Sequence, residues 1–153
     1  MANSQAMTTS FKGEILQALH NFGVTVVRAG TGADTFKGAL YYSSGSLGAG
    51  TTVYSTTDEV VGTNYVAGGV TVTNATAPAT GGTTAYWTPS GSLVYTNVTI
   101  TTSFDTVLIY NSTQANRAVS VHTFGSQSVT AGTFTLTMPA NTTSTALLRL
   151  ATT

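Results

Sequence analysis

The chain has 153 residues, which is enough for one domain with a buried core, and only 7% of them are charged, against about 25% in a typical soluble domain. Five basic and five acidic residues balance to a formal net charge of zero, so there is no basic stripe of the kind that neutralises nucleic-acid phosphates. The absence of cysteine excludes disulfides and thiolate sites, and no stretch approaches the roughly 18 apolar residues of a membrane span.

Threonine makes up about a fifth of the chain, well above its average usage. Its β-branched side chain suits a pleated strand and keeps an outward face polar without charge. The sequence therefore predicts an all-β protein, an antiparallel β-sandwich or a jelly-roll-like single domain, with hydroxyl-rich polar faces. A surface with so few charges has little colloidal repulsion, which weakly favours an assembly over a free monomer.

The first ten residues, MANSQAMTTS, are small and polar and lack the basic and apolar regions of a signal peptide. We predict that residues 1–10 form a flexible N-terminal arm and that residues 11–153 form the single β domain. The arm is interpreted either as a loose terminus or as a segment that orders against a neighbouring subunit.

The only helix candidate is Phe11–Phe22, where apolar residues recur at spacings of three and four and form one stripe. Ser10 is a candidate cap for its start, and Gly23 can end it in a left-handed conformation. We expect this amphipathic helix to cover an end or a face of the β domain, or else to dock on a partner.

Short β-prone runs separated by Gly, Asn, Ser and Pro follow at the regular spacing of an antiparallel sandwich or barrel, with about eight or nine strands. Loops are expected over Ser43–Thr52 and Asn74–Gly82. Outside the central hairpin, the predicted strands are Val24–Arg28, Thr35–Tyr42, Asn64–Thr73, Thr83–Thr88, Leu93–Thr102, Gln127–Met138 and Ala146–Ala151.

The central element is predicted to be a hairpin over Phe104–Gly125. Two strongly apolar runs, Val107–Tyr110 and Ala118–Phe124, are joined by the polar turn Asn111–Arg117. In the first run, large side chains fall on both faces of the strand, with Phe104 expected on the face of Thr106, Leu108 and Tyr110. A strand of this kind is covered on both sides, so we place it at the centre of the fold.

Residues that carry chemistry form no catalytic pattern in the sequence. Asp58 and Glu59 are adjacent and diverge on a strand or a helix, so we interpret them as a solvated turn or a cap for backbone amides. His20 and His122 lack the spacing of metal ligands, and no GxSxG elbow singles out one hydroxyl. We therefore expect no enzyme activity, no metal site and no cofactor.

Three further side chains have open interpretations. Arg117 closes the hairpin turn and Arg149 interrupts a hydrophobic strand; each is interpreted as a snorkelling surface residue, a partner for a nearby acid, or an interface residue. Trp87, the only tryptophan, is expected in the core or as a plug at one end of the fold rather than as a sugar-stacking platform.

Several segments resemble a family of small virion proteins of tailed bacteriophages. They are TFKGALYY over Thr35–Tyr42, TVYSTTDEVVGTNYVAGG over Thr52–Gly69, and LIYN and NRAVSVHTFG within Leu108–Gly125; GTFTLTMP, ending at Pro139, also fits. The resemblance covers most of the chain, and its middle block is the most specific. Family members often have a more acidic pair where this chain has His122 and Thr123.

The resemblance implies a non-enzymatic virion component and leaves two classes of function open. The first is a capsid decoration or cement protein on the outer head lattice, assembled in the host bacterial cytoplasm. Its partners would be the major capsid protein and other copies of the chain, as a trimer or dimer, without nucleic acid or membrane. The candidate assembly contacts are Thr8, Ser10, Phe11, Ile15, Arg117 and Arg149.

The alternative is a tail-fibre or receptor-binding β module of the phage tail that binds a glycan. This function needs exposed aromatic side chains on which sugar rings can stack. The candidates are Tyr54, Tyr65, Tyr86 and Trp87.

Overall fold

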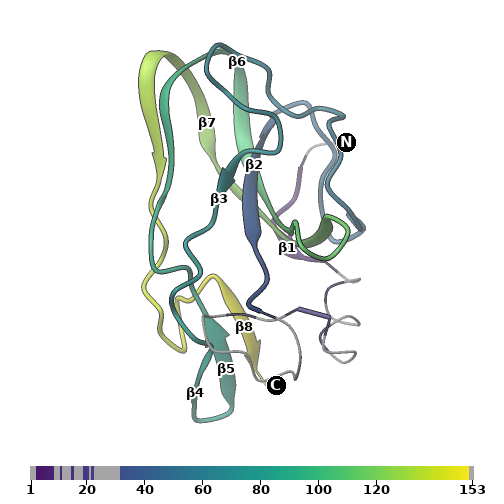
Figure 1. The fold of residues 1–153 in the computed structure, drawn as a ribbon, viewed down its shortest axis with the longest axis vertical. Coiled ribbons are helices and arrows are strands. Elements are labelled where there is room, and N and C mark those ends of the chain that lie inside the picture. The colour runs from purple at the N-terminus through teal and green to yellow at the C-terminus, as the bar shows by residue number, and fades with distance from the viewer. Residues whose placement is uncertain are drawn as a thin grey trace.

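The computed structural model describes residues 3–8, 11, 15, 19, 20, 22 and 32–151, and every element that it describes is a β-strand (Figure 1). The strands form two antiparallel sheets, which confirms the all-β prediction; the finer assignment to a sandwich or jelly roll stays a prediction. The strands are β1 (Ala6–Met7), β2 (Phe36–Tyr42), β3 (Val70–Thr71), β4 (Ala79–Gly81), β5 (Thr84–Trp87), β6 (Leu93–Asn111), β7 (Arg117–Leu136) and β8 (Leu148–Ala151).

The larger sheet has five strands in the order β1-β7-β6-β2-β3, and the smaller has three in the order β4-β5-β8. The smaller sheet lies at the lower end of the molecule, next to the C-terminal end of the described chain (Figure 1). In the part of the chain that is described, no helix is long and apolar enough to cross a membrane.

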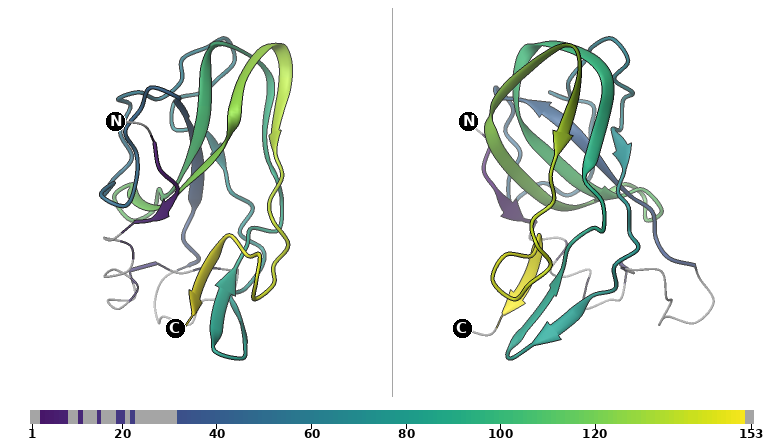
Figure 2. Two further views of the ribbon diagram at one scale, coloured as in Figure 1. Left: turned by 180° about the vertical axis from the view of Figure 1, so that it is seen from behind. Right: turned by 90° about the vertical axis from the view of Figure 1, so that its left-hand side faces the viewer.

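The predicted central hairpin is confirmed and is longer than expected. β6 joins the predicted strand Leu93–Thr102 to the first apolar run, and β7 joins the second run to most of Gln127–Met138, giving strands of 19 and 20 residues. Several register shifts interrupt their pairing, and Asn97 and Ala131 have φ angles of 53° and 44°. Such bulges bend a ribbon, and Figure 2 shows this one curving over at the upper end of the molecule.

The bend lets the hairpin cover itself. Leu93 and Tyr95, from the start of β6, belong to the same buried cluster as Val107 and Ile109, from its second half. The hydroxyl of Tyr95 donates to the Gly38 carbonyl of β2 at 2.8 Å, which fixes the first half of the ribbon over the sheet. Both halves of the β6–β7 hairpin therefore contribute to the larger core, together with β2 residues such as Phe36 and Leu40.

The opposite face of the larger sheet has a second, smaller core that includes Leu108 and Tyr110. The prediction that both faces of this strand are covered is thus confirmed. The predicted face of Phe104 was wrong, because Phe104 lies in the larger core with Val107 and Ile109. A register shift between Phe104 and Thr106 inverts the alternation at that point.

Other strand predictions need correction. Of Asn64–Thr73 only Val70–Thr71 is a strand, because the chain before it crosses over the sheet as a loop. Part of the expected loop Asn74–Gly82 forms β4 instead. The predicted strand Val24–Arg28 lies outside the described residues.

Residues 3–8 lie against the larger sheet. The Asn3 amide nitrogen donates to the Tyr42 carbonyl at 3.0 Å and to the Thr106 hydroxyl at 2.9 Å, and β1 pairs with β7. Thr8 is fully buried. In this structure these residues of the predicted arm are therefore docked on their own domain, and their detachment toward a neighbouring subunit stays a prediction.

The helix predicted over Phe11–Phe22 is not confirmed, because no helix is among the described elements and only five residues of that span are described. Three members of the predicted apolar stripe do pack on the larger core: Phe11 is buried, and Ile15 and Phe22 are partly buried. A periodic apolar stripe predicts which side chains are buried, whatever backbone conformation presents them.

Candidate assembly surface

The segment over residues 51–69 lies between β2 and β3, and the part that leads into β3 lies at the upper end of the molecule (Figure 1). We call it the crossing loop, because isolated β-bridges tie it to three separate strands. Val53 pairs with Arg117 of β7, Glu59 with Tyr41 of β2, and Thr63 with Thr99 of β6. The loop is therefore held along its length by backbone hydrogen bonds.

Glu59 anchors the middle of the crossing loop and is only 4% exposed. Its Oε2 accepts a hydrogen bond from the Tyr54 hydroxyl at 2.6 Å, and its Oε1 accepts from the Tyr65 hydroxyl at 2.8 Å and the Gly68 amide at 2.7 Å. A buried carboxylate is costly unless hydrogen bonds replace its hydration. These three donors all belong to the crossing loop, so the carboxylate links its first half to its second half.

A cage of tyrosines joins this anchor to the sheet. The Tyr65 hydroxyl accepts from the Leu40 amide at 3.0 Å, and the Tyr110 hydroxyl donates to the Gly68 carbonyl at 2.9 Å. The rings of Tyr54 and Tyr110 stack with centroids 4.6 Å apart. Burial, followed by the charge of Glu59, raises the pKa of Tyr110 to about 12, so its hydroxyl stays a neutral donor at physiological pH.

Burial also raises the pKa of Tyr54 and Tyr65, and their hydrogen bonds to Glu59 act in the same direction. Removing a proton from either phenol would place a second negative charge beside the buried carboxylate. The tyrosine hydroxyls of the cage therefore stay protonated and offer neither a general base nor a nucleophile.

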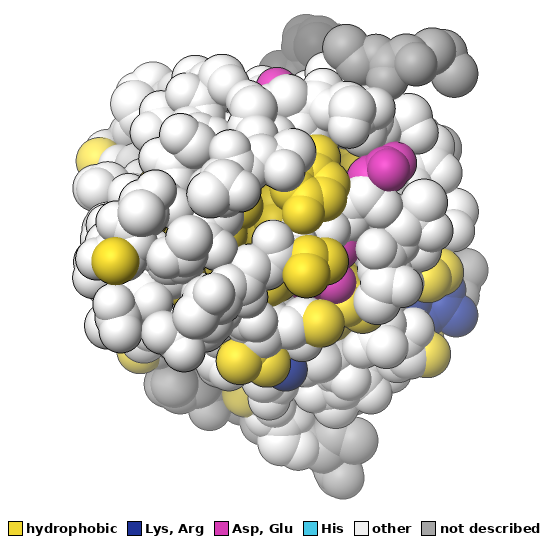
Figure 3. Space-filling view, turned by 90° about the horizontal axis from the view of Figure 1, so that it is seen from above, with side chains coloured by type: hydrophobic (Ala, Val, Ile, Leu, Met, Phe, Trp, Pro, Cys, Tyr) yellow, Lys and Arg dark blue, Asp and Glu magenta, His cyan; other side chains and the backbone are white. Residues whose placement is uncertain are grey.

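The crossing loop presents two large apolar side chains to solvent. Val61 is 80% exposed and Val66 is 73% exposed. Val61 sits on a fixed backbone, because its amide donates to the Tyr42 hydroxyl at 2.8 Å. Figure 3 views the molecule from this end and shows apolar side chains gathered in the middle of the face, surrounded mainly by uncharged groups. These two side chains are therefore available for contact with a partner.

The structure does not gather the predicted assembly contacts on one surface. Thr8 and Phe11 are buried and Ile15 is partly buried within their own domain, so they do not face a partner in this arrangement. Ser10 lies outside the described residues. Arg117 and Arg149 are both exposed, and the Arg149 Nε donates to the Thr143 carbonyl at 2.6 Å.

The four aromatic residues predicted for a glycan site lie in two separate places, one pair in the crossing loop and one pair on β5. Tyr54 and Tyr65 belong to the Glu59 cage, whereas Trp87 is buried in the larger core and donates from Nε1 to the Thr76 carbonyl at 2.8 Å. Tyr86 is half-buried on the smaller sheet. The expectation that Trp87 belongs to the core is confirmed, and these four rings do not form one stacking platform.

His122 is the nearest approach to a catalytic arrangement. Its Nε2 lies 2.8 Å from the Ser120 hydroxyl. However, Ser120 is buried in β7, where it pairs with Met7 of β1. Desolvation lowers the pKa of His122 to about 4, which makes the imidazole a poor base at neutral pH. Neither property suits a serine nucleophile that must reach a substrate.

A polar cluster lies at the C-terminal end of β6, and its side chains form hydrogen bonds within the protein. The Asn111 amide nitrogen donates to the Asp34 Oδ2 at 2.8 Å and lies 3.0 Å from the His20 Nδ1. The Asn111 Oδ1 accepts from the backbone amides of Thr113 and Gln114, which fixes the orientation of the side-chain amide. Among the described residues, no group of three or more His, Asp and Glu side chains could hold a metal ion.

Comparison with known proteins adds no relative. No family model, no curated protein and no solved structure matches this chain.

The sequence marked Thr52–Gly69 as the most specific block of the resemblance, but the hydrogen bonds that hold the crossing loop were not predicted. The interpretation of Glu59 as a cap for backbone amides holds for Gly68, yet the burial of Glu59 was not anticipated. Tyr54 and Tyr65 on either side of one carboxylate were the available signal for the cage. Val61 and Val66 each precede a glycine turn by one or two residues, which is a position that exposes a side chain.

Proposed function

We propose that this protein is a non-enzymatic virion structural protein that decorates the head of a tailed bacteriophage. In this proposal it binds the outer surface of the capsid lattice and stabilises contacts between neighbouring capsomers. The most specific block of the sequence resemblance, Thr52–Gly69, forms nearly all of the crossing loop. The segment that suggests a virion protein is thus also the segment that is built to present an apolar contact.

The observation that carries the proposal is the exposure of Val61 and Val66 on a loop that Glu59 holds in place. A contact that buries one valine side chain gains roughly 1.5 kcal/mol, so the two together supply about 3 kcal/mol. A binding free energy of about 3 kcal/mol is too small to hold a single copy on the particle. A decoration protein with several subunits gains avidity when each subunit binds the same particle.

The partners in this proposal are the major capsid protein and other copies of this chain. A near-neutral, hydroxyl-rich surface suits such an assembly, because it brings many copies close together without strong repulsion. The fixed loop also lowers the entropic cost of binding, since little of its backbone has to be ordered on contact.

The test is the binding of purified variants to phage particles that lack the protein. A double substitution, Val61→Glu with Val66→Glu, is expected to lower occupancy at least tenfold, because it places two charges in an apolar contact. The matched control is Val94→Glu on β6, a valine that is 45% exposed and distant in sequence from the loop.

Both proteins are first compared by thermal unfolding, so that only folded variants enter the binding assay. Native occupancy by the double variant would contradict the proposed surface. Equal losses in the double variant and in Val94→Glu would show that the effect is not specific to the crossing loop.

A further inference from the structure

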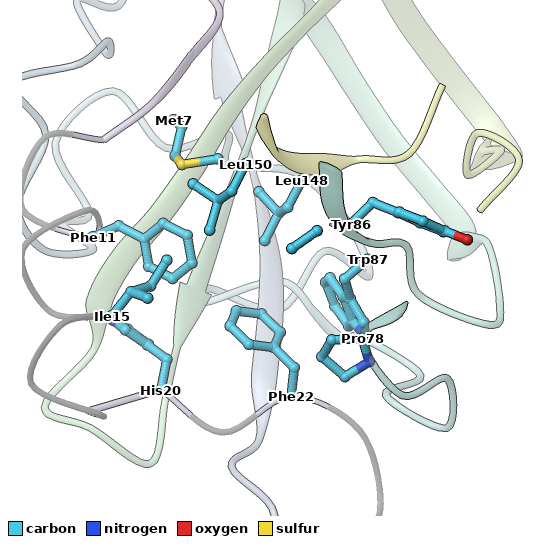
Figure 4. Close-up of a pocket in the computed structure, with 11 residues that line it drawn as sticks. Met7, Phe11, Ile15, His20, Phe22, Pro78, Tyr86, Trp87, Leu148 and Leu150 are labelled. Atoms are coloured by element: carbon cyan, nitrogen blue, oxygen red, sulfur yellow. The ribbon is translucent and has the colours of Figure 1, made fainter. Parts of the chain in front are cut away.

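An apolar pocket (Figure 4) is lined by residues between Met7 and Phe22 and by residues of the smaller sheet, which lies at the lower end of the molecule in Figure 1. Its cavity volume is about 200 Å³. Phe11 and Ile15 line one side, Phe22 and Trp87 line another, and Leu148 and Leu150 come from β8. Figure 4 shows these side chains arranged around one common space.

The aromatic walls of the pocket support one another. The Phe22 and Trp87 ring centroids lie 4.7 Å apart, and Phe22 also stacks on Phe36 at 4.7 Å. Phe11 meets Phe22 edge to face at 5.8 Å. Rings that hold each other in this way form a binding surface before a ligand arrives, which lowers the cost of binding.

Two of the polar atoms in the wall make hydrogen bonds within the protein. The Trp87 Nε1 donates to the Thr76 carbonyl at 2.8 Å, and the His20 Nδ1 lies 3.0 Å from the Asn111 amide nitrogen. The residues that line the pocket include no Asp, Glu, Lys or Arg. A charged ligand would lose hydration there without gaining an oppositely charged partner.

The volume of the pocket limits the size of the apolar ligand that it can hold. A cavity of about 150 Å³ lined by Leu, Ile and Phe is large enough for benzene, whereas pockets for drug-sized molecules have about 300–1,000 Å³. A volume of about 200 Å³ lies between these limits. We propose that this pocket binds an apolar molecule with a single ring, such as an alkylbenzene. The inference is independent of the proposed capsid function.

Toluene is the probe, and the fluorescence of Trp87, the only tryptophan in the chain, reports its binding. We expect a saturable fluorescence change with a dissociation constant of about 0.1–1 mM. Benzoate is the matched probe, because it has a similar ring and adds a carboxylate. It is expected to bind at least tenfold more weakly. Equal binding of the two probes, or the absence of a saturable change with toluene, would overturn the proposal.

A cavity-filling variant locates the site. Ala85 lines the pocket from β5, so Ala85→Leu is expected to weaken toluene binding at least tenfold. Ala140→Leu, at an exposed alanine that does not line the pocket, is the control and should stay within twofold. If Ala85→Leu does not fold, Leu150→Phe takes its place, because Leu150 lines the pocket and is 44% exposed. Unchanged affinity in the folded filling variant would exclude this pocket as the site.

Discussion

Glu59 is a buried carboxylate whose hydrogen bonds come from hydroxyl and amide groups of its own loop. Hydrogen bonds to a charged acceptor are stronger than those between neutral groups. The same arrangement makes the loop sensitive to substitution, because loss of the carboxylate leaves Tyr54, Tyr65 and the Gly68 amide without their acceptor. The Glu59 carboxylate therefore acts together with the backbone bridges and the Tyr42 hydroxyl to hold the loop that carries the exposed valines.

Replacement of Glu59 tests its role as an anchor. Glu59→Ala is expected to lower the free energy of unfolding by about 3 kcal/mol, because one buried and two partly buried donors lose one charged acceptor. Urea unfolding measures the change. Asp58→Asn is the control, since Asp58 is exposed and asparagine tolerates its φ of 62°; its effect should stay within about 0.5 kcal/mol. Similar losses in both variants would contradict the anchor.

His122 gives a prediction for acid pH. Its pKa in the folded protein is about 4, below the value of about 6.5 for an unfolded chain. Between these values the unfolded chain binds a proton that the folded chain does not. The stability contributed by neutral His122 is therefore complete above pH 6.5 and is lost as the pH falls toward 4.

The comparison is between the native protein and His122→Gln, which does not titrate in this range. Relative to His122→Gln, the native protein is expected to lose up to about 3 kcal/mol of unfolding free energy between pH 7 and pH 4. Denaturant unfolding at each pH measures it, and the carboxylates common to both proteins cancel in the difference. Parallel stability curves would show that burial does not suppress protonation of His122.

The β6–β7 ribbon shows how far element prediction from the sequence extends. Alternating apolar residues predicted the hairpin around residues 112–116 and the burial of both faces of Val107–Tyr110, which local patterns determine. The polar stretches near Ser103 and Gly125 were interpreted as breaks between strands. They are bulged parts of continuous strands, because tertiary packing of the bent ribbon maintains pairing where local propensity is weak.

The junction of β2 and β3 depends on Gly69, which ends the crossing loop. Its φ is 70°, and a Cβ at this position would lie 1.7 Å from the Gly38 carbonyl oxygen. Gly69→Ala is therefore expected to cost more than about 3 kcal/mol in unfolding free energy or to prevent folding.

Gly82→Ala is the control for Gly69→Ala, because it introduces backbone strain without a steric clash. Gly82 also has a positive φ, of 56°, but a Cβ there would have nothing within 4 Å. Its substitution should cost only about 1 kcal/mol. Thermal and urea unfolding of both variants measure the difference. A Gly69→Ala protein as stable as Gly82→Ala would contradict the close approach of loop and sheet.

At the scale of the whole molecule, the two ends have different characters. One end carries the fixed crossing loop with its exposed valines, and the other carries the apolar pocket beside the smaller sheet. The sequence carries a local signal for the cage in Tyr54 and Tyr65, but their attachment to the sheet does not follow from it. The hydrogen bonds of Tyr65 with Leu40 and of Tyr110 with Gly68 form only through the fold, as does the contact of Phe22 with Trp87. Composition did indicate the weakly charged, hydroxyl-rich character of the chain.

The proposed function requires many copies of the protein on each particle. The most direct test is quantitative mass spectrometry of purified virions, with the copy number expressed relative to the major capsid protein. A capsid decoration protein predicts a ratio near one, or one copy per few capsid subunits. A few copies per particle, or none at all, would contradict the proposal that this chain decorates the head lattice.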